Sequence, residues 1–132
     1  MPNVNQHLAK VRSNKEMLNH LGDAKSTKFP DWFSTVSFYI AVHGVEAILC
    51  QEAGLHTKTH VERDEKLRKR LPAMTQEFLT AYRTLYARSR QARYMLDNKF
   101  EMTNHDSEEA LADLKVIETE CKETYFDNYP NP

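Results

Sequence analysis

The sequence is poor in the residues that form tight turns. It contains three glycines and five prolines among 132 residues, and most of the prolines lie near the ends of expected segments. A many-stranded β fold needs such residues in its hairpins, so their scarcity argues against one and favours helices. A chain of this length is long enough for one core but not for two. We therefore expect a single domain over residues 1–132.

Cysteine is scarce as well. Cys50 and Cys121 are the two cysteines, and their separation matches no metal-binding or redox motif. Both lie on expected apolar helix faces, which predicts buried, reduced thiols in a reducing compartment. The N-terminus lacks the apolar core of a signal peptide, and no apolar run approaches membrane-spanning length. These features predict a cytoplasmic protein with no membrane contact.

A strong charge of one sign is also lacking. The 18 Lys and Arg residues nearly balance the 19 Asp and Glu residues, which leaves a formal net charge of −1. The total charge therefore does not indicate a nucleic-acid-binding protein. However, more than half of the basic residues lie between residues 58 and 93, whereas acidic residues dominate 101–127. A locally basic surface is compatible with this distribution.

Apolar residues repeat at helical spacing through most of the chain. The expected helices cover residues 5–21, 32–51, 61–71 and 75–96, followed by a last helix that Asp106 or Ser107 caps and that reaches Tyr125. The second of them, with Asp31 as its expected N-cap, is apolar on two sides, which indicates a central helix or contact with a partner subunit. Four long helices and one short helix predict an all-α, up-and-down bundle with a frayed tail over 128–132.

Two polar residues interrupt the most apolar helix. His43 lies in the middle of its broad apolar face, and Glu46 follows about one turn later. Burying such groups is costly unless they are hydrogen-bonded. Two interpretations remain open: a core pair that a neighbouring hydroxyl or carboxylate satisfies, and part of a binding site.

The patterns that indicate metal binding are weak. Di-iron sites in helical bundles use the motif Glu-x-x-His, which this sequence lacks. His56 and His60 are four residues apart, but they lie in an expected loop without a nearby third ligand. We therefore expect neither a metal site nor a cofactor.

The segment 85–94, with the sequence Leu-Tyr-Ala-Arg-Ser-Arg-Gln-Ala-Arg-Tyr, mixes basic and aromatic residues. Helical spacing places Ser89 in the centre of an apolar stripe and Arg93 at its edge. Such a ridge can hold phosphates and stack on bases, or it can be a solvated face whose arginine stems cover the tyrosines. The candidate binding residues are His43, Glu46, Tyr86, Ser89, Arg93 and Tyr94. We expect the four that lie in the segment 85–94 to face His43 and Glu46. No phosphate loop or catalytic triad is present, so no catalytic residue is predicted.

Four segments, in this order, cover roughly residues 29–125 and match the pattern of a known family. They are Asp31-Trp32 with the stretch Phe-Tyr-Ile-Ala-Val-His-Gly-Val-Glu-Ala at 38–47, the turn Thr-Lys-Thr-His at 57–60, the segment 85–94, and an acidic last helix with Glu109-Ala110 and Leu114. In these segments the chain resembles the HEPN superfamily (higher eukaryotes and prokaryotes nucleotide-binding).

The resemblance implies a bundle of four or five helices that commonly forms a homodimer. Many members of the superfamily work beside a small nucleotidyltransferase partner in toxin–antitoxin pairs, and others bind nucleotides or cleave RNA. The RNA-cleaving members carry an Arg-x4-6-His motif, which this chain lacks. Ser89 stands where that arginine is expected, between Arg88 and Arg90, and Arg93 replaces the family's aspartate.

The resemblance, together with the missing cleavage motif, leads us to expect one of three functions. The first is a nucleotide- or RNA-associated binding module, one half of a toxin–antitoxin pair with a nucleotidyltransferase, without the usual cleavage motif. The second is a divergent, metal-independent ribonuclease toxin that uses His43 or His60 with a neighbouring arginine. The third is a non-catalytic, dimeric interaction protein.

Overall fold

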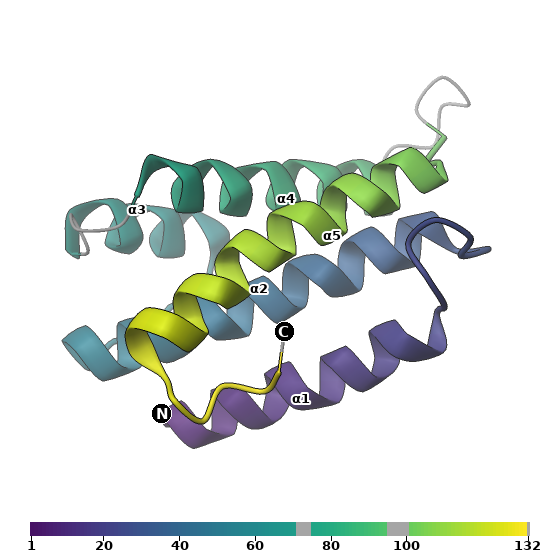
Figure 1. Cartoon of the computed structure of the whole chain (residues 1–132). Helices are drawn as coiled ribbons and strands as arrows, with labels where there is room; N and C mark the ends of the chain where they lie inside the picture. Colours follow the sequence, from purple (N-terminus) through teal and green to yellow (C-terminus); the bar gives the residue numbers. More distant parts are fainter. Residues whose placement is uncertain (71–74, 95–100, 132) are drawn as a thin grey trace.

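The protein is an all-α bundle of four long helices and one short helix, as the sequence predicts (Figure 1). The computed structural model describes residues 1–70, 75–94 and 101–131. Its helices are α1 (Val4–His20), α2 (Pro30–Ala53), α3 (His60–Arg70), α4 (Gln76–Tyr94) and α5 (Asn104–Glu120), which the π-helical turn η2 (Cys121–Tyr125) extends. The long helices alternate in direction along the chain, and α3 lies between α2 and α4 in sequence. The predicted helix ends at residues 71 and 96 lie outside the described residues.

Helix α2 is the centre of the bundle, with α1, α4 and α5 packed around it. Ile40, Ile48 and Leu49 are fully buried, as the two-sided apolar pattern predicts. By length and composition α2 could cross a membrane, although the sequence prediction found no apolar run of such length. In this structure 78% of its most apolar window is buried inside the bundle, which is the environment of a core helix.

Two helices begin earlier than predicted because their caps differ from those expected. Phe29 is the N-cap of α2, and Pro30 occupies the first turn, where its fixed φ angle suits a helix. Asp31 therefore lies inside the first turn and is not the cap. At α5 the cap is Thr103, whose backbone N–H donates to Asp106 Oδ2 at 2.8 Å. Asp106 is thus the N3 residue of a capping box.

The end of α2 turns the chain back toward the middle of that helix. Gly54 has a φ of 63°, a left-handed conformation that glycine adopts without steric cost. The loop 54–59 then runs back to α3. This reversal brings His56 and Thr57 against the α2 side chains that precede them by about three turns.

The C-terminal tail is anchored, in contrast to the predicted fraying. Tyr129 is 2% exposed, and its hydroxyl donates to Glu118 Oε2 at 2.5 Å. Lys15 of α1 also donates to Glu118, at 2.9 Å to each oxygen. Both cysteines are free thiols, as expected, but only Cys121 is fully buried, whereas Cys50 is half-buried.

Candidate functional site

Glu46 lies on α2 with only 2% of its surface exposed, and both carboxylate oxygens have partners. Its Oε1 accepts hydrogen bonds from Arg63 Nε, at 2.8 Å, and from the Thr57 hydroxyl. Its Oε2 accepts one from the Thr57 backbone N–H at 3.1 Å. Burial would raise the pKa of Glu46, but the hydrogen bonds from Thr57 and Arg63 outweigh it and hold the pKa below its usual value. The carboxylate is therefore charged at neutral pH.

Arg63 connects this carboxylate to α4. The arginine is 8% exposed, and its Nη1 donates to the Tyr82 hydroxyl at 3.2 Å. Burial raises the pKa of Tyr82 to about 12, so this phenol is neutral. A buried ion pair between Arg63 and Glu46 thus joins α3 to α2. A buried hydrogen bond from Arg63 to the Tyr82 hydroxyl joins α3 to α4.

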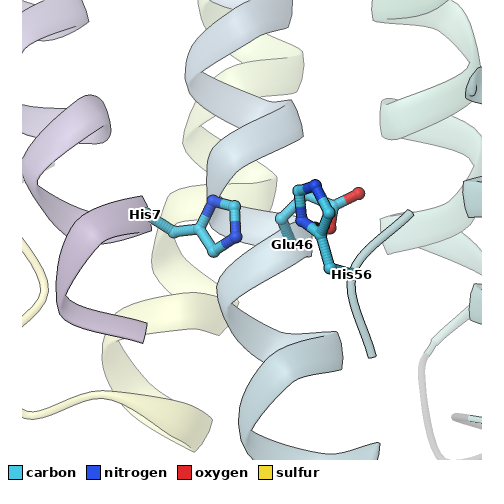
Figure 2. A group of neighbouring side chains, drawn as sticks. All are labelled: His7, Glu46 and His56. Atoms are coloured by element: carbon cyan, nitrogen blue, oxygen red, sulfur yellow. Dashed lines mark ion pairs between the residues drawn. The ribbon is translucent and has the colours of Figure 1, made fainter. Parts of the chain in front are cut away.

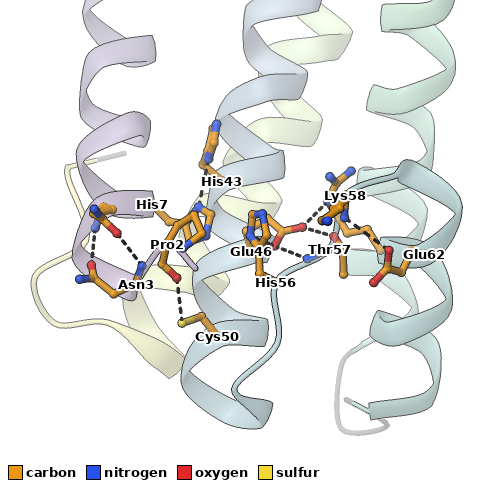
Figure 3. A network of polar contacts seen from close by, with 12 residues as sticks. Pro2, Asn3, His7, His43, Glu46, Cys50, His56, Thr57, Lys58 and Glu62 are labelled. Carbon is orange, nitrogen blue, oxygen red and sulfur yellow. Dashed lines mark hydrogen bonds and ion pairs between the residues drawn. The ribbon is translucent and has the colours of Figure 1, made fainter.

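Three histidines lie beside Glu46, where α1 and the 54–59 loop meet α2. His7 points from α1 toward Glu46, and the ring of His56 lies next to the carboxylate (Figure 2). The rings of His7 and His56 stack with centroids 5.5 Å apart, and His56 Nδ1 lies 3.4 Å from Glu46 Oε2. His7 Nδ1 lies 3.2 Å from His43 Nδ1, which extends the network along α2 (Figure 3).

Two of these histidines are neutral at physiological pH. Burial lowers the pKa of His7 from its ordinary value of 6.5. Burial and, second, the neighbouring His7 lower the pKa of His43 to about 4. A neutral imidazole can accept a proton or bind a metal ion through its free nitrogen. His7 and His43 therefore have the protonation state that either chemistry requires.

A groove of about 760 Å³ opens next to the histidines. Its walls come from the N-terminal residues, from one face of α1 that includes Lys10, and from His7, His43 and His56. The groove leaves the histidine cluster accessible from one side, while Glu46 closes the other. A small anion or a metal-bound water could reach the rings from this groove.

A second polar cluster covers the C-terminal half of α4, and we name it the basic–aromatic patch. It consists of Tyr39, Tyr86, Arg90, Arg93 and Tyr94. Arg93 donates from Nη1 to the Tyr39 hydroxyl at 2.8 Å and from Nη2 to Ser89 Oγ at 3.1 Å. Its Nε donates to the Ser89 backbone carbonyl at 3.2 Å. Ser89 is buried and fixes the guanidinium in this orientation.

The ring of Tyr94 lies close to two guanidinium groups. Its centroid is 5.2 Å from Arg90 Cζ and 5.1 Å from Arg93 Cζ, within the range of cation–π contacts. Tyr94 is 63% exposed and Tyr39 is 39% exposed, so both rings are accessible at the surface. Arg88 is not part of the patch, because it lies 3.6 Å from Asp106 and from Asp113 of α5.

Tyr86 forms the inner edge of the patch. Its ring stacks on His60, with centroids 3.3 Å apart and an interplanar angle of 2°. Arg90 Nη1 donates to the Tyr86 hydroxyl at 3.3 Å. His60, which the sequence places in a loop, is the first residue of α3 and packs against α4. Burial lowers its pKa.

The six candidate residues occupy three environments. Tyr86, Ser89, Arg93 and Tyr94 come together as predicted from their spacing on α4. They were expected to face His43 and Glu46, but Arg93 reaches Tyr39, one turn before His43. His43 instead faces α1 at the groove, and Glu46 lies under the 54–59 loop.

The sequence interpretation missed several partners of these residues. His7 and Arg63 are both buried, although neither was a candidate. Two spacings in the sequence were available as signals. His7 lies four residues before Val11 on the apolar stripe of α1, and Arg63 lies four residues before the buried Leu67.

Comparisons with protein-family models, with curated proteins and with solved structures find no match for this chain. No relative therefore assigns a role to the histidine cluster or to the basic–aromatic patch.

Proposed function

We propose that this protein is a HEPN-like module that binds nucleotides or single-stranded RNA through the basic–aromatic patch. The observation that carries the proposal is the exposed ring of Tyr94 within cation–π distance of the guanidinium groups of Arg90 and Arg93. Guanidinium groups form strong, charge-assisted hydrogen bonds to phosphate oxygens. Exposed aromatic rings stack on bases of any sequence. One surface thus offers the two kinds of contact that a nucleotide needs.

The orientation of Arg93 supports the same proposal. Hydrogen bonds to Tyr39 and Ser89 hold its guanidinium in one position before any ligand arrives. Each terminal nitrogen of the guanidinium carries two N–H groups, and each uses one in these bonds. Among the described residues no partner is recorded for the second donor on each nitrogen, which can bind a phosphate. Holding the group in place lowers the entropy lost on binding.

The resemblance to the HEPN superfamily extends the proposal to partners. It implies a homodimer and a nucleotidyltransferase partner in a toxin–antitoxin pair, and the sequence features described above add a cytoplasmic location. Phe29 and Trp32, at the start of α2, support an interaction surface because 51% and 58% of their surfaces are exposed. Large exposed aromatic side chains are enriched where proteins associate.

We expect Arg93→Ala and Tyr94→Ala to weaken RNA binding without altering the fold. Loss of one stacking aromatic typically costs about 1–3 kcal/mol, or about 5- to 150-fold in affinity. The measurement is fluorescence anisotropy with a labelled single-stranded RNA and with free nucleotides at several salt concentrations. Circular dichroism verifies the fold of each variant.

Arg12→Ala is the matched control for charge, because it removes one exposed arginine from α1, outside the patch. A general electrostatic effect would weaken binding equally in Arg12→Ala and Arg93→Ala. Equal affinities for the wild type, Arg93→Ala and Tyr94→Ala would contradict the assignment of the patch. They would favour the third expectation, a non-catalytic interaction protein.

A second candidate function is metal-independent cleavage of RNA at the groove. The observation that favours it is the hydrogen bond between two histidines with lowered pKa values, His7 and His43, next to Lys10. A neutral imidazole can accept the proton of a ribose 2′-hydroxyl, and a lysine can attract the phosphate. His60 is the weaker alternative, because its ring is covered by Tyr86.

Cleavage at the groove predicts that RNA is degraded in the presence of a chelator and that His43→Gln abolishes the reaction. The assay follows a labelled RNA on a denaturing gel, with His20→Gln as a control at an exposed histidine near the end of α1. RNA that stays intact with the wild-type protein excludes this function. Loss of cleavage in both variants would point to a contaminating nuclease.

A further inference from the structure

Three side chains with metal-binding atoms converge at the inner end of the groove. One ring nitrogen each of His7 and His56 and a carboxylate oxygen of Glu46 all lie within 4.8 Å of one another (Figure 2). They come from α1, the 54–59 loop and α2, so only the folded chain assembles them. Two imidazoles and one carboxylate form a ligand set that zinc enzymes use.

Two nitrogens of this group make no hydrogen bond to any described residue. They are His7 Nε2 and His56 Nδ1, both buried, and His7 as a whole is only 3% exposed. The Glu46 carboxylate lies 3.4 Å from His56 Nδ1 but forms no hydrogen bond with it. A buried polar atom without a hydrogen bond costs about 1–3 kcal/mol, so such atoms are rare in folded proteins. A metal ion bound between the two nitrogens would accept both lone pairs.

The distances fit a small metal ion. At bond lengths of about 2.0–2.1 Å, two ligands of a tetrahedral ion lie about 3.4 Å apart. His56 Nδ1 and Glu46 Oε2 are separated by 3.4 Å. The His7 nitrogen lies within 4.8 Å of both other ligand atoms and reaches the same spacing by moving inward. A change in its side-chain torsions can supply this movement.

The surrounding residues contact these side chains in the way that hydrogen-bond partners orient the ligands of known metal sites. Metal-binding histidines usually bond through their other ring nitrogen to a further group, and His7 Nδ1 lies 3.2 Å from His43 Nδ1. Arg63 and the Thr57 hydroxyl donate to Oε1 of Glu46. Oε2 accepts the Thr57 backbone N–H, and its second lone pair can bind a metal. The charge of Arg63 lowers the affinity for a cation but fixes the carboxylate.

We propose that His7, Glu46 and His56 bind one divalent zinc ion, with the fourth coordination position open to the groove. Nitrogen and oxygen ligands in this number favour zinc over calcium or magnesium, which prefer sites built from oxygen. The open position would hold a water molecule, as in catalytic zinc sites. The inference is independent of the basic–aromatic patch and goes beyond the proposed binding of RNA.

The test is a titration of the purified, chelator-treated protein with Zn²⁺ by isothermal calorimetry, and with Co²⁺ by visible absorption. We expect one ion per chain, a raised Tm, and the d–d bands of a four- or five-coordinate Co²⁺ site. His56→Gln should lower the affinity at least about 100-fold, more than the loss of an outer partner usually does. His56 is half-buried, so this variant is expected to fold.

His7→Gln tests the buried ligand, and His105→Gln is the matched control at an exposed histidine. The proposal requires weakened binding in both ligand variants and unchanged binding in the control. It is overturned by an absence of stoichiometric binding, by equal affinity in wild type and His56→Gln, or by a thiolate charge-transfer band that assigns the ion to Cys50. If His7→Gln fails to fold, the comparison of His56→Gln with His105→Gln still decides the outcome.

Discussion

Glu46→Ala should destabilise the protein by about 3–5 kcal/mol, because it leaves the charge of Arg63 buried without its partner. Arg63 is 8% exposed, and once the carboxylate is removed the neutral hydroxyl of Tyr82 is its one remaining hydrogen-bond partner among the described residues. The same substitution also takes an acceptor from Thr57. Urea denaturation followed by circular dichroism measures the change in the free energy of unfolding.

The double variant Glu46→Leu/Arg63→Met separates a lost ion pair from lost packing. Replacing both members of a buried pair with apolar residues of similar volume is often neutral or stabilising. We therefore expect the double variant to be at least about 2 kcal/mol more stable than Glu46→Ala. If both variants are equally unstable, the loss comes from packing or from Thr57, and the ion pair is not the cause.

Most of the fold could be predicted from the sequence because it depends on local periodicity. The apolar repeat located the four long helices, and the two-sided pattern of α2 indicated a central position. The starts of α2 and α5 were wrong by two to four residues, because several residues compete for each cap. Asp106 resembles a cap in sequence, but in the structure it is the N3 residue of the capping box that begins at Thr103.

The sites were harder to predict because they depend on contacts between distant segments. His43 and Glu46 look like a pair in sequence, yet three residues rotate a side chain by about 60° around the helix. That rotation is enough to direct His43 to α1 and Glu46 to the 54–59 loop. His7 contacts His43 although it lies 36 residues earlier in the sequence. No local sequence pattern predicts this contact.

The histidine cluster illustrates the same limit for chemistry. His56 and His60 invited a metal interpretation because they are four residues apart, and the absence of a third ligand argued against it. In the structure His60 lies against Tyr86 on α4, whereas His56 meets His7 and Glu46. The ligand set is thus composed of one residue from each of three segments. Such a set has no characteristic spacing that a motif could describe.

Tyr129→Ala, in the C-terminal tail, should lower the free energy of unfolding by about 3–5 kcal/mol. The substitution opens a cavity where a 2% exposed ring packs near Gly44 and Cys121. It also removes the hydroxyl that donates to the buried Glu118. Only Lys15 then remains to pair with that carboxylate among the contacts that the described residues make. Chemical denaturation at neutral pH measures the loss.

Tyr129→Phe distinguishes the two contributions, because it keeps the ring and removes only the hydroxyl. We expect it to cost about 1–3 kcal/mol, the range for leaving a buried acceptor with one partner fewer. Tyr94→Ala is the matched control, since the same truncation at a 63% exposed tyrosine should change stability by no more than about 0.5 kcal/mol. If Tyr129→Ala is as mild as Tyr94→Ala, the tail frays in solution, as the sequence alone predicted. A loss several times larger means that Tyr129 is part of the core and anchors the tail to the bundle.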